Sequence, residues 1–150
     1  MTLDLIKQLR DETGAGIMEI KKALDESAGD LAKTRAVLKK SGAAKAAKRA
    51  ERTAGQGMVE AYSHNGRIGV LVEVNCETDF VARGDDFKTF THDCALQVVA
   101  MKPENVDDLL KQEYVKDPSQ TVGDLLETLI AKTGEKIVVS RFVVYELGKE

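Results

Sequence analysis

The sequence has 150 residues, of which 43% are hydrophobic and 31% charged, with a net charge of −3. This composition is typical of a soluble globular protein, and aromatic residues make up only 5%, which predicts a mostly aliphatic core. The longest apolar runs, such as residues 68–72, are much shorter than the ~20 residues that cross a bilayer, which excludes a membrane-spanning helix.

The first residues and the cysteines both indicate the compartment. Residues 1–5, MTLDL, lack the basic leader and the hydrophobic core of a signal peptide, so we expect a cytoplasmic protein. Cys76 and Cys94 are expected to be reduced thiols, although the sequence leaves a disulfide between them open.

Charge is unevenly distributed along the chain. Residues 1–54 contain 12 Lys/Arg against 8 Asp/Glu, whereas residues 55–150 contain 10 against 17. This asymmetry favours separate modules. We predict a helical module at 1–42, a basic helical linker at 43–54 and an α+β core domain at 55–150.

The first module is predicted to form three short helices. Thr2 and Asp30 lie at the cap positions of the first and third helices. Residues 13–16 break the first helix, the second spans about 16–26, and residues 41–42 are expected to end the third. The apolar stripes of the three helices consist of Leu5, Ile6, Leu9, Ile17, Ile20, Ala23, Leu24, Leu31, Thr34, Val37 and Leu38.

Met18 lies off the apolar stripe of the second helix and is expected on the surface. A surface methionine needs no special role, and this ordinary interpretation is favoured by the position alone; contact with a partner is the alternative.

The linker is rich in alanine and basic residues, including Lys45, Lys48, Arg49 and Arg52. Alanine favours helix, and no apolar stripe is present. The positive charge suggests nucleic acid, but the stretch lacks interleaved aromatic residues on which bases stack. We therefore predict a solvated linker with no direct contact to nucleic acid.

The core domain is predicted to be a three-stranded antiparallel sheet packed with helices. Asn65-Gly66 between two strand-like runs, 58–64 and 67–76, is a strong hairpin signal. A third strand at 137–146 is expected to pair with that hairpin. Helices are predicted at about 85–101 and after the capping box that begins at Thr121. Their apolar stripes contain Phe87, Phe90, Cys94, Val98 and Met101 in the first, and Val122, Leu125, Leu126 and Leu129 in the second.

We find no motif that predicts catalysis, a cofactor or a metal. No glycine-rich turn is followed by Gly-Lys-Ser/Thr, as a phosphate-binding loop requires. His64, Cys76, His92 and Cys94 lack the C-x-x-C spacing of zinc sites, and Cys94 falls on a core stripe. No pair of carboxylates stands out as acid and base. The sequence therefore predicts a protein that acts by binding rather than as an enzyme.

Residues 73–83, EVNCETDFVAR, lie between the predicted return strand and the long helix. Asp79 is expected to cap a helix. For Phe80 two interpretations are open. It is a core residue, which the pattern alone favours, or it is an aromatic presented at a strand-to-helix corner for a partner.

Two segments resemble signatures of the elongation factor Ts family. Residues 9–24, LRDETGAGIMEIKKAL, are similar to its N-terminal signature, and residues 73–83 are similar to its second signature. Residues 133–137 with Arg141-Phe142 resemble a further family stretch. The segments occur in the family's order, with a basic linker between the two signatures.

The resemblance implies a guanine-nucleotide exchange factor for elongation factor Tu. Its N-terminal module is then a ubiquitin-associated-like three-helix bundle that docks on the GTPase domain. The residues that carry this contact are Arg10, Thr13, Gly14 and Met18. The alternative function is a ubiquitin-associated-like adaptor that binds another protein.

The same resemblance gives Thr78, Asp79, Phe80 and Val81 the role of an exchange wedge. Phe80 enters between helices of the GTPase, which displaces the elements that hold Mg²⁺ and disturbs the phosphate-binding loop. GDP then leaves and GTP binds, because Mg²⁺ neutralises the nucleotide phosphates and its loss weakens their attachment.

The chain departs from longer family members, which carry a second core copy, a coiled-coil insertion and a C-terminal segment. Short members that resemble it pair two chains, each with one core copy. The resemblance therefore implies a homodimer.

Overall fold

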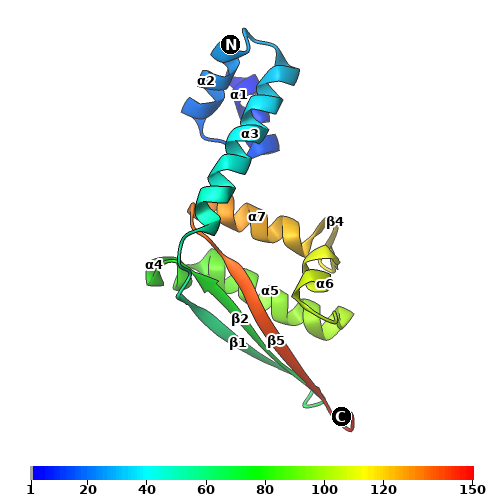
Figure 1. Cartoon of the computed structure of the whole chain (residues 1–150). Helices are drawn as coiled ribbons and strands as arrows, with labels where there is room; N and C mark the ends of the chain where they lie inside the picture. Colours follow the sequence, from blue (N-terminus) through cyan, green and yellow to red (C-terminus); the bar gives the residue numbers. More distant parts are fainter. Residues whose placement is uncertain (1) are drawn as a thin grey trace. The chain divides into compact units, whose positions relative to one another are not determined.

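A computed structural model of the chain describes residues 2–150, which form two compact units that divide between Arg52 and Thr53. Figure 1 shows helices in the first unit and a sheet with helices in the second. In residues 2–150, no helix combines the length and the apolar character needed to cross a membrane. The N-terminal unit contains α1 (Leu3–Thr13), α2 (Ile17–Glu26) and α3 (Leu31–Ala50); the C-terminal unit contains β1 (Gln56–His64), β2 (Ile68–Cys76), α4 (Asp79–Ala82), α5 (Asp85–Met101), α6 (Val106–Lys111), β3 (Glu113–Tyr114), β4 (Asp117–Thr121), α7 (Val122–Thr133) and β5 (Val138–Glu146).

The N-terminal unit is a three-helix bundle around a small aliphatic core. Leu9 and Ile20 are fully buried, and Leu38 of α3 packs with them. The predicted stripes are correct except at Ile17 and Leu31, whose side chains are exposed. Both are first residues of their helices, and because helical side chains tilt toward the N-terminus, no preceding turn of the same helix lies under them.

The predicted caps have different outcomes. Asp30 caps α3 by accepting a hydrogen bond from the Lys33 N–H at 3.0 Å, as expected. Thr2 occupies the cap position of α1, but its side chain makes no capping hydrogen bond to the described residues.

The prediction that residues 41–42 end the third helix is wrong, because α3 continues to Ala50. Glycine inside a helix costs about 1 kcal/mol relative to alanine. Here the Ser41 hydroxyl donates to the Glu19 carboxylate of α2 at 2.5 Å, and Lys45 pairs with the same carboxylate at 2.5 Å. These contacts and the alanines after Gly42 offset its cost.

The hairpin is confirmed. β1 pairs antiparallel with β2 in a register that joins Gln56 to Cys76 and His64 to Ile68. Asn65 and Gly66 both have positive φ, 53° and 65°, as the tight turn requires.

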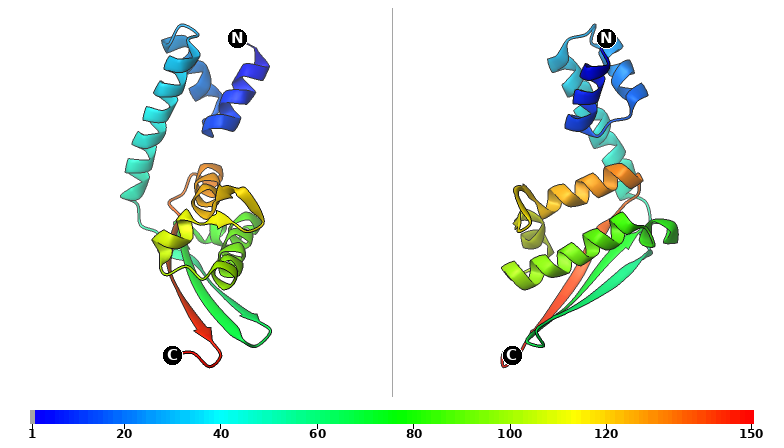
Figure 2. Two further views of the ribbon diagram at one scale, coloured as in Figure 1. Left: turned by 90° about the vertical axis from the view of Figure 1, so that its right-hand side faces the viewer. Right: turned by 180° about the vertical axis from the view of Figure 1, so that it is seen from behind.

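The α+β fold class is also confirmed. The main sheet is antiparallel with strand order β1-β2-β5, so β2 is its central strand. Helices α5, α6 and α7 lie on one face of this sheet (Figure 2). The core between them contains buried side chains from β2, α5, α6, α7 and β5: Val70, Val72, Val74, Cys76, Phe87, Cys94, Val98, Leu109, Val122, Leu129 and Val139.

Some features of the C-terminal unit were not predicted. The short helix α6 and the two-stranded β3–β4 sheet occupy the stretch between the two predicted helices. Met101, predicted as a core residue, is exposed because it ends α5 next to Lys102, whose φ is 47°. The capping box at Thr121 is confirmed, with both of its reciprocal hydrogen bonds to Asp124 formed.

Gly57 provides a test of the close packing of β1 against β2. It has a φ of 143°, and a Cβ at this position would lie 2.1 Å from the Val74 carbonyl oxygen of β2. We expect Gly57→Ala to lower the free energy of unfolding by about 2–4 kcal/mol, since both backbone strain and a steric clash result. Urea unfolding measures the change. Gly55→Ala is the matched control, because nothing lies within 4 Å of its added methyl group; equal effects of the two variants would contradict the prediction.

Candidate partner-binding site

The corner between β2 and α5 is built around Thr78. Thr78 has extended backbone, and its Oγ1 accepts a hydrogen bond from the Val81 N–H at 3.3 Å, which caps the short helix α4. The prediction that Asp79 is the cap is wrong by one residue. Asp79 is instead the first residue of α4, where its charge suits the helix N-terminus and where it pairs with Arg83.

Phe80 is not a core residue: its side chain is 85% exposed. The interpretation favoured by the pattern alone is therefore wrong, and the ring is presented to solvent at the corner. Its neighbour Val81 is half-buried against the hydrophobic core and anchors α4 to the unit. The predicted four-residue site therefore comprises a cap, a charged first-turn residue, an exposed ring and an anchor.

A carboxylate that we did not predict as a site residue holds this corner. Glu135, in the loop between α7 and β5, accepts hydrogen bonds from the N–H groups of Glu77 and Thr78 at 3.1 and 3.0 Å. Its other oxygen accepts from the Thr78 hydroxyl at 2.7 Å. In return, the Glu77 carboxylate accepts from the Lys136 N–H at 3.0 Å. The only signal in the sequence was the family-like stretch at residues 133–137, to which no role was attached.

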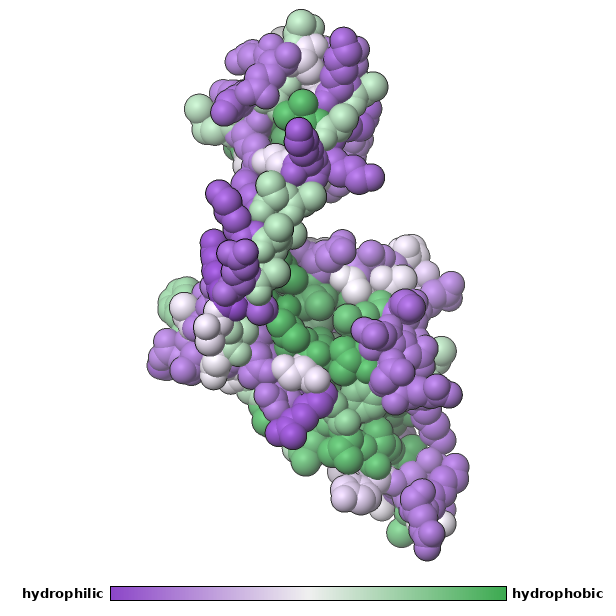
Figure 3. All heavy atoms as spheres, viewed as in Figure 1, coloured by the Kyte–Doolittle hydropathy of each residue, from purple (hydrophilic) through white to green (hydrophobic). Residues whose placement is uncertain are grey.

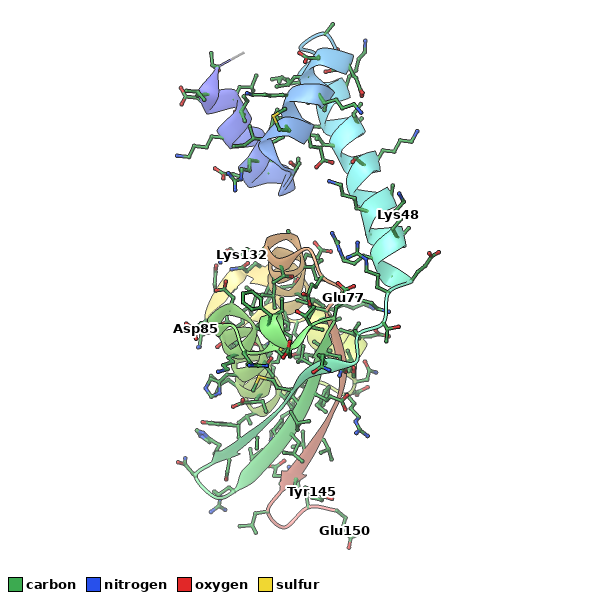
Figure 4. The ribbon with its side chains drawn as sticks, turned by 90° about the vertical axis from the view of Figure 1, so that its left-hand side faces the viewer. Lys48, Glu77, Asp85, Lys132, Tyr145 and Glu150 are labelled. Carbon is green, nitrogen blue, oxygen red and sulfur yellow. The ribbon has the colours of Figure 1, made fainter. Side chains whose placement is uncertain are left out.

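Figure 4 shows Glu77 at the end of β2, close to the segment that leads into β5. The two loops therefore meet at this point, although 58 positions separate Glu77 from Glu135 in the sequence.

The cysteines contribute packing. Cys76 is fully buried and its thiol donates to the Thr78 carbonyl oxygen at 3.1 Å. Burial, with the carboxylates of Glu135 and Asp79 nearby, raises the pKa of this thiol. Burial raises the pKa of Cys94 to about 12. Both side chains are therefore neutral thiols at pH 7, and in the part of the chain that the structure describes no three His, Cys, Asp or Glu residues are grouped to hold a metal ion.

Charged side chains lie beside Phe80. A groove beside the ring is lined by α4, Gly84 and the first turn of α5, including Asp85 and Asp86. Asp86 pairs with Lys132 of α7 at 3.2 Å, while Figure 4 shows Asp85 on the surface. The rim beside the ring therefore carries both acidic and basic side chains, because Arg83 also lines the groove and pairs with Asp79.

The second set of candidate residues lies in the N-terminal unit, around the turn from α1 to α2. Met18 is 76% exposed, which confirms its predicted surface position. Gly14 ends α1 with a φ of 68°, and the Thr13 hydroxyl donates to the Leu9 carbonyl oxygen at 2.5 Å. Arg10 is exposed in the last turn of α1. Thr13 and Gly14 therefore shape the turn, whereas the side chains of Met18 and Arg10 are exposed next to it.

Comparison with known proteins identifies the family. The elongation factor TS family model matches residues 77–150. The chain is 45% identical to elongation factor Ts of Coprothermobacter proteolyticus over 195 aligned residues, covering 99% of each chain. The chain belongs to the elongation factor Ts family.

Two further relatives support the same family assignment. Identity to elongation factor Ts of Thermotoga neapolitana is 44%, over 100% of this chain and 98% of the relative. Identity to elongation factor Ts of Rubrobacter xylanophilus is 42%, over 97% and 98%. The alignment with the first relative extends over 195 positions, more than the 150 residues of this chain, so that relative has positions with no counterpart here.

Proposed function

We propose that this elongation factor Ts family member is a guanine-nucleotide exchange factor for elongation factor Tu, with Phe80 as the exchange wedge. The observation that carries the proposal is the exposed ring on a fixed corner. Moving a large apolar side chain that is 85% exposed into a pocket on a partner is favourable, because it removes apolar surface from water. Because Thr78 and Glu135 already hold the corner, little conformational freedom is lost on binding.

The mechanism needs no covalent step. Phe80 enters between helices of the GTPase domain and displaces the elements that hold Mg²⁺. The phosphates then lose the charge that neutralised them, and GDP dissociates. The coupling is reciprocal, so GDP weakens the binding of this protein by the same factor by which this protein weakens the binding of GDP.

The N-terminal unit supplies a second contact in this proposal. Met18 and Arg10 dock on the GTPase domain, while Thr13 and Gly14 hold the turn that presents them. Docking by one unit raises the effective concentration of the other at its site, because both are on one chain. This increases occupancy of the wedge without requiring strong binding by Phe80 itself.

We further propose that the chain forms a homodimer through the face of the sheet opposite its helices. Ala61, Leu71 and Val143 lie side by side across the three strands on this face. Leu71 and Val143 are 46% and 44% exposed, and Tyr145 is exposed beside them. Figure 3 shows a separate apolar area between β5 and the helices, at the edge of the sheet and not on this face. The same face also carries the Glu73–Arg141 ion pair beside these apolar residues. Exposed apolar residues of this kind suit a twofold interface, in which the same patch is buried on both chains.

The wedge is tested by the release of fluorescently labelled GDP from elongation factor Tu. We expect Phe80→Ala to slow release by about tenfold or more, since the side chain that disturbs the Mg²⁺ site is removed. The free energy of unfolding should change by no more than about 0.5 kcal/mol, because the ring is exposed. Val115→Ala, an exposed apolar residue in the turn between β3 and β4, is the control. If wild-type protein fails to accelerate release, the proposed function is wrong.

Docking is tested separately at Met18. We expect Met18→Ala to weaken binding to nucleotide-free elongation factor Tu about tenfold, measured by titration calorimetry, because an exposed apolar contact is lost. Leu3→Ala truncates an equally exposed apolar residue of the same unit and serves as control. Unchanged affinity of the Met18 variant would remove this residue from the interface.

The dimer is tested by multi-angle light scattering across the micromolar range. We expect wild-type protein to have twice the mass of one chain and Leu71→Lys to have the mass of a monomer, since a buried unpaired charge disrupts an apolar interface. Val115→Lys places the same charge elsewhere and should remain dimeric. A monomer mass for wild type would refute the dimer.

A further inference from the structure

We propose that Glu135 is a positioning residue for exchange, which sets the orientation of Phe80 through Thr78. This inference rests on the exchange function proposed above. It adds the loop between α7 and β5 to the functional part of the molecule, although Phe80 lies 55 positions earlier in the chain.

The first step of the argument is that Phe80 does not fix its own position. An 85% exposed ring has few packing contacts, so its direction depends on the backbone of α4. That helix has only four residues, and such a short helix is unstable without support from its surroundings. The position of the ring therefore depends on whatever holds the two ends of α4.

The second step concerns the C-terminal end of α4. Val81 and Ala82 are half-buried and pack against the core. These apolar contacts hold the helix to the unit, but nonpolar packing is non-directional. They therefore do not by themselves set its rotation.

The third step concerns the N-terminal end. The Thr78 side chain accepts the Val81 N–H and donates its own hydroxyl proton to Glu135. The same carboxylate accepts the Glu77 and Thr78 N–H groups. Hydrogen bonds to an ionised acceptor are short and strongly directional, and three of them determine the orientation of the Thr78 backbone and rotamer together. The cap, and with it α4, is thus aligned by Glu135.

The fourth step is the support of Glu135 itself. The loop N–H of Lys136 donates to Glu77 at 3.0 Å, and Glu135 receives the Glu77 N–H, so the two loops are joined in both directions. In addition, the Thr133 hydroxyl accepts the Glu135 N–H at 3.3 Å at the end of α7. A side chain held by its own neighbours is suited to position a functional group on another segment.

The experiment measures the maximal rate of GDP release from elongation factor Tu at saturating concentrations of the full-length chain. We expect Glu135→Ala to lower that rate roughly tenfold, since a misoriented wedge loses efficiency steeply. The concentration of chain that gives half-maximal release should change less than about twofold, because the N-terminal contact is intact. Glu135→Gln, which retains one acceptor oxygen, should fall between wild type and Glu135→Ala.

The matched control is Glu127→Ala, which removes an exposed carboxylate from α7 and should leave the rate unchanged. The decisive comparison is a double-mutant cycle with Phe80→Ala. If Glu135 acts through Phe80, its removal has little further effect once the ring is gone. Additive effects in the cycle would overturn the inference, because they would show that Glu135 acts on its own.

Loss of folding is separated from loss of positioning by urea unfolding of each variant. Should Glu135→Ala not fold, the cycle is performed with Glu135→Gln, and a wild-type maximal rate for that variant would overturn the inference. Wild-type protein that does not accelerate release would refute the exchange function instead, so the two failures are distinguishable.

Discussion

The burial of one face of β2 is the constraint on which the C-terminal unit depends. β2 is the central strand, and Val72, Val74 and Cys76 on its helix-facing side are fully buried. Because side chains alternate along a strand, this burial fixes which residues face the helices and which face outward. It also fixes the end of the strand: Cys76 is the last buried residue, and the chain turns immediately after it. The buried thiol of Cys76 donates a hydrogen bond to the Thr78 carbonyl oxygen, so the position of β2 in the core also fixes the start of the corner.

The corner combines a rigid base with an exposed tip. After the strand ends, the N–H groups of Glu77 and Thr78 donate to the Glu135 carboxylate. The exposed ring of Phe80 contributes little to stability, because it buries little apolar surface in the free chain. Folding of the unit therefore does not depend on this ring, which is consistent with the binding role that we propose for it. In the N-terminal unit the same division holds, with buried Leu9 and Ile20 forming the core and Met18 exposed beside it.

Much of the fold was predictable from local pattern. Three local signals each act over a few residues and predicted their structures correctly. They are the hairpin turn at Asn65-Gly66, the alternation along β2 and the capping box at Thr121. Some errors fell at the ends of helices, as for Ile17, Leu31, Met101 and the cap at Asp79, and another arose where tertiary contacts decided the outcome. Gly42 continues a helix because Ser41 and Lys45 contact Glu19 of another helix, and no local rule describes that contact.

The candidate site was less predictable than the fold. Local pattern favoured a core position for Phe80, because aromatic side chains are usually buried, and left an exposed position as the alternative. Its exposure depends on the rotation of α4, which Thr78 and Glu135 set. The contact of Glu135 with Thr78 joins segments 57 positions apart, and a single sequence gives no direct signal for such a pair.

The arrangement of the corner also bears on how a binding protein can act as an exchange factor. A protein that releases GDP must itself be released when nucleotide returns, because the coupling between the two is reciprocal. Very strong binding to the GTPase would trap the nucleotide-free complex. In the proposed mechanism the small area of the exposed ring limits the affinity of the wedge contact itself, while its fixed direction concentrates the effect on one place in the partner. Rigidity at Thr78 and Glu135 thus provides efficiency without requiring a large interface.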